Sequence, residues 1–195
     1  MPDLVLDPRR TAIIVIDLQQ GIVARTTHPH PAARVVANTV SILRAARRTG
    51  AMPVLVHVGG CEDGRDRLRP AADEVMPAAP MPPGWSDLVP DLERAPGDLV
   101  ILKRQWGAFY GTDLELQLRR RGLDTLVLCG IATEFGVEGT ARDAYERGFA
   151  QVFASDAMAA LSAEAHTHCL TRIFPRMGHV RDTEAVLAAL GGPCD

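Results

Sequence analysis

The sequence predicts an α/β fold, a three-layer sandwich in which a six-stranded parallel sheet lies between two layers of helices. Short apolar segments alternate along the chain with longer helical patterns, as they do in parallel sheets with right-handed crossovers. Three of the apolar segments, Thr11–Ile16, Asp98–Leu102 and Thr125–Cys129, are continuously hydrophobic. Continuous rather than alternating runs are typical of parallel strands that are covered on both faces.

The individual elements follow from turn and cap signals between the apolar runs. The expected strands are Thr11–Ile16, Pro53–Val58, Asp98–Leu102, Thr125–Cys129, Gln151–Ala154 and Gly178–Arg181. The expected helices cover residues 31–49, 112–121, 136–147, 162–174 and 183–190. Thr112 and Glu115 have the spacing of a capping box at the start of the second helix. Gly122 follows the arginine-rich end of that helix, as a C-terminal glycine does, and Gly50 and Gly148 end two other helices in the same way.

Residues 59–97 interrupt this alternation, because they hold half of the 14 prolines and only scattered apolar residues. A connection of this length is usually a functional excursion or a linker. Trp85, one of two tryptophans in the chain, is expected to anchor it. Two interpretations remain open, a surface excursion and a lid or wall of a substrate site. The chain shows no internal repeat, and we expect one domain over residues 1–195.

Composition excludes several functional classes. The hydrophobic content of 47%, the charged content of 23% and the net charge of −3 are ordinary for a soluble protein and give no electrostatic reason to expect nucleic acid. No apolar run approaches the roughly 20 residues of a membrane span, and no secretory signal is visible. The four cysteines have no CxxC spacing, which favours reduced thiols in the cytoplasm. His57 has no second histidine nearby, and His166 and His168 do not share a helix face, so no metal is expected.

Three features that carry chemistry fall at the ends of predicted strands. Asp17 follows five apolar residues, and Lys103 ends the third strand in the same way. The carboxyl ends of parallel strands are where such sheets bind ligands. The turn at 130–136 adds backbone N–H groups at a helix start, a suitable place for an anion. Each of these residues also has a simpler interpretation when it is taken singly. Asp17 could cap a loop, and Lys103 could extend from the sheet into water. Gly136 could be a residue that merely permits the turn. No P-loop or dinucleotide fingerprint is present, so no cofactor is expected.

Together these three strand ends resemble the isochorismatase-like (cysteine hydrolase) superfamily. The motifs that carry the resemblance are Asp17-Leu18-Gln19, Lys103-Arg104-Gln105-Trp106-Gly107-Ala108-Phe109 and Gly130-Ile131-Ala132-Thr133-Glu134-Phe135-Gly136-Val137-Glu138-Gly139-Thr140. It continues through Ala141-Arg142-Asp143-Ala144 and Ser155-Asp156-Ala157 and so covers nearly the whole chain. The resemblance implies a Rossmann-like sheet with strand order 3-2-1-4-5-6 and a homodimer or homotetramer.

The resemblance also implies an incomplete catalytic triad. Amidase members of the superfamily use an Asp–Lys–Cys triad, and Asp17 and Lys103 match its first two positions. The third position falls on Gly136, while Cys129 lies inside the strand and is interpreted as a structural thiol. The implied strand order separates the Asp17 and Lys103 strand ends by about 10 Å, so the lysine must lean across the sheet edge. A non-proline cis peptide is implied between Ala132 and Thr133.

In having glycine at the nucleophile position the chain is similar to the true isochorismatases, which cleave a vinyl ether and release pyruvate. This likeness implies hydrolysis of a small anionic metabolite without a covalent intermediate, with Asp17 as general acid and Gly136 leaving space for the substrate. Lys103 lowers the pKa of such an acid and burial raises it, and the sequence leaves that balance open. The expected substrate-binding residues are Gln19, Trp106, Phe109, Ala132, Thr133 and Glu134, although Trp106 and Phe109 equally fit packing of their loop. Characterised isochorismatases have tyrosine and histidine where this chain has Ala132 and Glu134.

Two other functions remain as alternatives to this hydrolase. The first is a non-catalytic binding protein that kept a small-molecule pocket after losing the thiol. The second is a residual amidase that uses water activated by Asp17. The closest resemblance is to bacterial family members of unknown activity that carry Lys-Arg-Gln-Trp-Gly-Ala-Phe-Tyr-Gly-Thr-Asp-Leu, here residues 103–114, and the same glycine.

Overall fold

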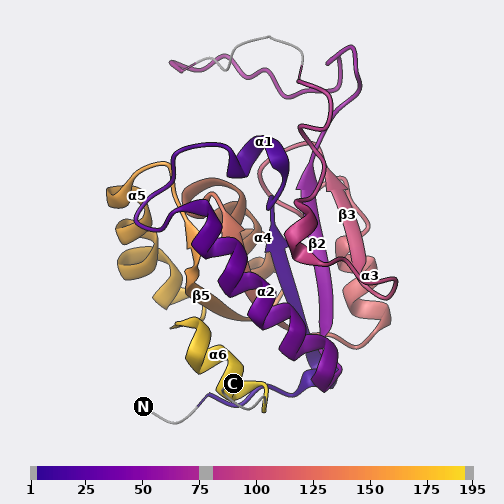
Figure 1. Ribbon diagram of the computed structural model, residues 1–195, viewed down its shortest axis with the longest axis vertical. Coiled ribbons are helices and arrows are strands. Elements are labelled where there is room, and N and C mark those ends of the chain that lie inside the picture. The colour runs from indigo at the N-terminus through magenta and orange to yellow at the C-terminus, as the bar shows by residue number, and fades with distance from the viewer. Residues whose placement is uncertain (1–3, 75–80, 192–195) are drawn as a thin grey trace.

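A six-stranded, all-parallel sheet forms the centre of the computed structural model, which describes residues 4–74 and 81–191 (Figure 1). The strand order β3-β2-β1-β4-β5-β6 is the one predicted. The strands are β1 (Thr11–Ile16), β2 (Met52–Val58), β3 (Leu99–Lys103), β4 (Thr125–Ile131), β5 (Ala150–Ala159) and β6 (His179–Arg181). Every residue of β1 is buried, as its continuous apolar run predicts. Cys194 and part of the proline-rich segment, residues 75–80, lie outside the described ranges.

Helices cover both faces of this sheet. On one face, α2 (Ala32–Thr49) and α6 (Thr183–Ala189) pack against the side chains that include Ile13 and Val15 of β1. On the other face, α3 (Leu114–Arg120) and α4 (Glu138–Glu146) pack against Ile14 and Ile16. Successive β1 residues therefore supply two separate cores. The remaining elements are α1 (Gln20–Val23), α5 (Ala163–His168), the 3-10 turns η1 (Pro8–Arg10), η2 (Pro90–Leu92) and η5 (Phe174–Arg176), and the π-helical turns η3 (Thr133–Val137) and η4 (Cys169–Ile173).

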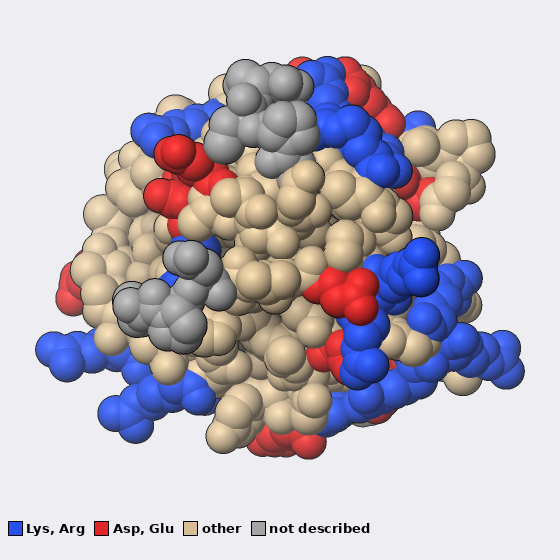
Figure 2. Space-filling view, turned by 90° about the horizontal axis from the view of Figure 1, so that it is seen from below, with Lys and Arg blue, Asp and Glu red and all other residues tan. Residues whose placement is uncertain are grey.

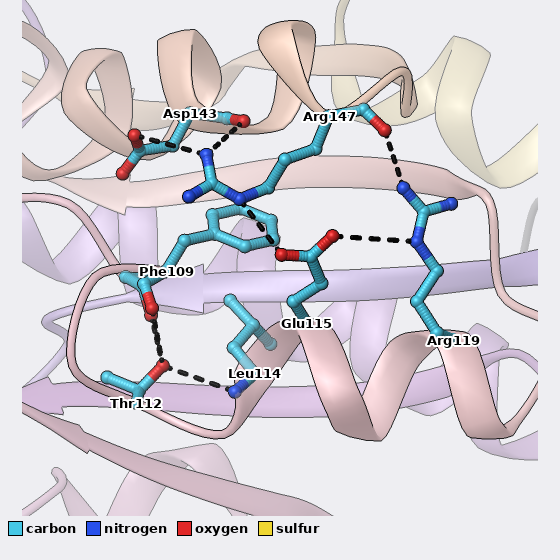
Figure 3. Close-up of polar contacts among 8 residues, drawn as sticks. Phe109, Thr112, Leu114, Glu115, Arg119, Asp143 and Arg147 are labelled. Atoms are coloured by element: carbon cyan, nitrogen blue, oxygen red, sulfur yellow. Dashed lines mark hydrogen bonds and ion pairs between the residues drawn. The ribbon is translucent and has the colours of Figure 1, made fainter.

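The expected capping box of α3 is wrong, and Figure 3 shows what replaces it. The helix begins at Leu114, and the Thr112 hydroxyl accepts a hydrogen bond from the Leu114 N–H at 3.2 Å. Glu115 does not return to Thr112. Its carboxylate instead pairs with Arg147 at 3.1 Å and with Arg119 at 3.7 Å. The Glu115 carboxylate that a capping box would use is therefore paired with Arg147, which follows α4, and with Arg119 of the same helix.

Two other predicted elements have different limits in the structure. The expected helix at 162–174 is divided into α5, η4 and η5, and Pro175, which has no N–H to donate, lies in the last of these turns. Strand β5 continues to Ala159, five residues beyond its predicted end. Its polar residue Asp156 is accommodated because its carboxylate accepts hydrogen bonds from the Thr183 N–H and hydroxyl, both at 2.7 Å.

Described residues of the connection from β2 to β3 extend beyond the carboxyl edge of the sheet, at the top of Figure 1. On the opposite, amino edge, Arg side chains lie around the rim with Asp and Glu among them (Figure 2). The middle of that face carries few charges. Within the described ranges, no helix is long and apolar enough to cross a membrane.

Candidate active site

Asp17 and Lys103 meet at the carboxyl edge of the sheet. Asp17 directly follows β1 with a left-handed backbone (φ 54°), and its N–H donates to the Val56 carbonyl at 2.9 Å. Lys103 is the last residue of β3, on the far side of β2. The Lys103 Nζ nevertheless lies 2.8 Å from Asp17 Oδ2. The predicted lean of this lysine across the neighbouring strand is therefore confirmed.

Both charged groups of this pair are withdrawn from water. Lys103 is 1% exposed and Asp17 is 6% exposed. The ammonium also donates to the Trp106 carbonyl. Asp17 Oδ1, in contrast, is buried without a hydrogen-bond partner among the described residues. An unpaired buried acceptor costs free energy. Because Oδ2 is occupied by Lys103, Oδ1 is the carboxyl oxygen that can carry a proton or bind a ligand.

Burial raises the pKa of Asp17 to about 6, although the Lys103 ammonium and, to a smaller extent, His57 lower it. Desolvation thus outweighs the neighbouring positive charge, which is the balance that the sequence left open. At pH 7 a carboxyl group with this pKa is protonated in about one molecule in ten. Asp17 can therefore hold a transferable proton near neutral pH, as a general acid must.

Gly136 faces this pair directly. A Cβ added to Gly136 would lie 3.0 Å from Asp17 Oδ2 and 3.3 Å from Lys103 Nζ. The three positions that the sequence assigns to a triad therefore converge in space. The same added atom would lie only 2.7 Å from the Cγ2 methyl of Ile16, a separation at which something must shift. The site is packed around a glycine, and a side chain at position 136 would require the Ile16 side chain or the turn itself to shift.

The turn that carries Gly136 approaches β1 because of Gly130. This glycine has φ 118°, and a Cβ there would lie 2.0 Å from the Ile16 carbonyl oxygen. The chain then enters the π-helical turn η3. The expected cis peptide between Ala132 and Thr133 is wrong, since the non-proline cis bond is Ile131–Ala132. It directly follows the last residue of β4, one residue earlier than the motif suggested.

Gln19 has a different environment from the one expected of a substrate-binding residue. Its side chain is buried, and its Nε2 donates to the carbonyls of Val58 at 3.0 Å and Trp85 at 3.2 Å. Its Oε1 accepts from the Val58 N–H at 2.8 Å. Because these bonds occupy both ends of the amide, Gln19 fastens the proline-rich segment to the end of β2.

The turn residues Thr133 and Glu134 also make contacts within the protein. The buried Thr133 hydroxyl lies 3.0 Å from His166 Nδ1, and burial lowers the pKa of His166 to about 4. Glu134 Oε1 accepts from the Leu161 N–H at 2.8 Å, whereas its Oε2 is buried without a partner among the described residues. Ala132, which precedes them, is nearly buried. These contacts fix the turn against α5 and the end of β5.

The structure separates the two aromatic residues of the Lys103 motif. Trp106 is 65% exposed, with its ring centroid 4.8 Å from that of Phe135. Phe109 is buried in the core, with its ring 5.7 Å from Phe149 and under the guanidinium of Arg147 (Figure 3). For Phe109 the packing alternative therefore describes the observed contacts, whereas Trp106 presents its aromatic face to solvent.

The proline-rich segment returns to the sheet beside the site. Trp85 lies against the backbone of Gly21, where an added Cβ would come within 2.0 Å of the indole. The predicted anchoring role of Trp85 is thus confirmed. His57 Nδ1 lies 2.7 Å from the Ser86 carbonyl and therefore carries the proton of that bond. We did not predict from the sequence that His57 lowers the pKa of Asp17. The position of His57 near the end of the second strand, close to the same sheet edge, is the signal that could have indicated it.

Cys129 adds no reactive thiol to this site. Cys129 is fully buried in β4, and burial raises the pKa of its thiol to about 12, which agrees with a structural thiol. Within residues 4–74 and 81–191, no three His, Cys, Asp or Glu side chains are gathered as metal ligands.

A parallel sheet with a buried acid–base pair at its carboxyl edge defines this chain as an α/β protein built like an enzyme. The Isochorismatase domain family model matches residues 11–185. The chain belongs to the isochorismatase family.

Relatives match almost the full length of the chain. It is 49% identical over 188 residues to the uncharacterized isochorismatase family protein YecD of Escherichia coli O157:H7, covering 96% of this chain and 100% of that protein. It is 30% identical to the ureidoacrylate amidohydrolase RutB of Methylobacterium radiotolerans, covering 97% and 83%. The solved structure of an isochorismatase family protein from Burkholderia thailandensis superimposes with a TM-score of 0.92 at 44% identity, covering 97% and 99%. The chain therefore has the fold of a family that includes hydrolases.

Proposed function

We propose that this protein is a hydrolase that acts on a small anionic metabolite without a covalent cysteine intermediate, with Asp17 as its general acid. The observation that carries the proposal is the buried Asp17 carboxyl group, with one oxygen on Lys103 and the other unpaired. Gly136 lies against both groups and supplies no nucleophile. A route through an acyl-enzyme at position 136 is thereby closed, and the proposed chemistry depends on proton transfer to or from Asp17.

Hydrolysis of a vinyl ether fits these groups best. Asp17 Oδ1 gives its proton to the methylene carbon of an enol ether, and the electrons of the double bond form the new C–H bond. Water adds to the resulting oxocarbenium ion and loses a proton to the Asp17 carboxylate. The hemiketal then breaks its bond to the alcohol oxygen, which leaves with a proton, and pyruvate is released.

Lys103 assists this step through charge. Proton transfer converts Asp17 into a carboxylate 2.8 Å from the Lys103 ammonium. That attraction is stronger after the proton has left than before, so it stabilises the transition state more than the ground state. Burial supplies the proton near neutral pH, and the ammonium stabilises the charge that its departure creates.

The walls of the site give the remaining residues their proposed roles. Trp106 offers an exposed aromatic face to the substrate. Ala132 and Glu134 shape the turn opposite, and the buried Oε2 of Glu134 is a polar group without a partner among the described residues. Gln19 and Thr133 act by holding these walls in place. We keep a cytoplasmic homodimer or homotetramer as part of this proposal.

The two alternatives are weaker on specific grounds. A residual amidase that uses water activated by Asp17 is suggested by the name of RutB. Gly136 supplies no nucleophile, and amide hydrolysis without a nucleophile needs more assistance than these residues give. A binding protein needs no proton donor. It leaves the raised pKa of Asp17 and its unpaired oxygen without a role.

The test is pyruvate release from isochorismate at high concentrations of the wild-type protein, measured against a reaction without protein. Release above that background would establish vinyl-ether hydrolysis. The differences at Ala132 and Glu134 would then concern the choice of substrate rather than the type of reaction. Failure to release pyruvate would remove isochorismate as the substrate. Survival of a bound enol ether unchanged would favour the binding protein.

A further inference from the structure

A second candidate binding site, separate from the one at the carboxyl edge, is a surface pocket of about 560 Å³ between α4 and the turns that follow α5. Its lining residues are Arg142, His168, Arg172, Ile173, Arg176 and Met177. We propose that this pocket binds a small organic phosphate, with the phosphate on the arginines and the organic part on Ile173 and Met177. None of these residues belongs to the site built around Asp17.

Three of the six residues that line the pocket are arginines. Arg172 lies in the π-helical turn η4 and Arg176 in the 3-10 turn η5, four residues further along. Arg142 comes from α4, so the pocket is formed by segments distant in sequence. π-helical turns occur often at functional sites, and here the turn places one arginine at the rim of a concave surface.

The charges of the pocket are incompletely neutralised within the protein. Arg142 forms an ion pair with Glu138 at 2.7 Å. The side chains of Arg172 and Arg176 make no ion pair or hydrogen bond with any residue that the structure describes. Glu164 lines an adjoining hollow that shares His168 and Arg172, so the acidic side chains lie at the margins. Two free guanidinium groups suit a phosphate, because each can donate two parallel hydrogen bonds to its oxygens.

The apolar side of the pocket distinguishes an organic phosphate from a simple ion. Ile173 and Met177 are each only partly buried, and Met adapts readily to ligands of different shape. A pocket with a few polar groups and an apolar wall is the usual form of a small-molecule site. An aromatic or aliphatic body attached to the phosphate would cover this wall.

The test compares inorganic phosphate with phenyl phosphate by isothermal titration at low salt, where screening is weak. We expect the wild-type protein to bind phenyl phosphate about tenfold more tightly than inorganic phosphate, because only the former covers the apolar wall. The variant Arg172→Ala/Arg176→Ala should weaken phenyl phosphate binding by about tenfold or more. The matched control is Arg48→Ala/Arg120→Ala, which removes two exposed arginines elsewhere that also lack described side-chain partners.

The proposal is supported if binding depends on the first arginine pair and changes less than about twofold with the control pair. Equal losses of phenyl phosphate affinity in the two variants would show that binding depends only on the net charge of the protein, and would overturn the proposal. Undiminished binding in Arg172→Ala/Arg176→Ala, or no binding by the wild type, would overturn it as well. Because the readout is binding, the outcome does not depend on the reaction proposed for Asp17.

Discussion

Replacement of Asp17 by asparagine should lower kcat by about two to four orders of magnitude, the usual contribution of a general acid. Asparagine has nearly the same shape but holds no acidic proton, and Gly136 offers no alternative nucleophile. Activity within tenfold of the wild type would show that Asp17 does not transfer the proton. The measurement is the turnover of any substrate that the wild type is found to cleave.

The same substitution should also destabilise the fold, which must be separated from the chemistry. Asp17→Asn leaves the Lys103 ammonium, which is 1% exposed, without its anion. Removing one partner of a buried pair typically costs about 3–5 kcal/mol. A loss of activity in this variant alone could therefore arise from the missing acid or from partial unfolding of the protein.

The double variant Asp17→Asn/Lys103→Met separates these two effects. It replaces both charges by uncharged groups of similar volume, a change that is often neutral for stability. We expect urea unfolding to show that the double variant regains most of the free energy lost by Asp17→Asn, while its activity stays absent. A double variant as unstable as the single one would contradict a direct ion pair.

A surface pair provides the scale for this comparison. Arg44 and Glu93 are joined at 2.6 Å, but both side chains are more than half exposed. Arg44→Gln should change the free energy of unfolding by less than about 1 kcal/mol, because exposed ion pairs contribute little. The contrast between the two pairs measures the effect of burial rather than of charge.

Much of the fold could be predicted because its signals are local. The continuous apolar run of β1 reports burial on both faces, and the left-handed glycines Gly50 and Gly122 mark the ends of α2 and α3. Errors arose where tertiary partners decide the outcome. Glu115 pairs with Arg147 instead of capping its own helix, and Asp156 sits within a strand because Thr183 satisfies it.

The candidate site was only partly predictable for the same reason. Strand ends place Asp17 and Lys103 at one edge, and the implied strand order predicts that the lysine leans across β2. Only the structure shows that burial outweighs the effect of the lysine's charge on the pKa of Asp17. A motif also names residues without saying what their side chains contact. Gln19 and Phe109 lie in site motifs, yet their contacts are internal.

The most direct test of Asp17 as a general acid is the pH dependence of kcat/KM, which reports the ionisation of the free enzyme. The carboxyl group is protonated below its pKa of about 6 and ionised above it. A reaction that needs the proton should therefore lose about tenfold in kcat/KM for each pH unit above that value. A kcat/KM that instead rises through pH 6, or is flat, would show that Asp17 acts as a base or not at all, and would contradict the proposed mechanism.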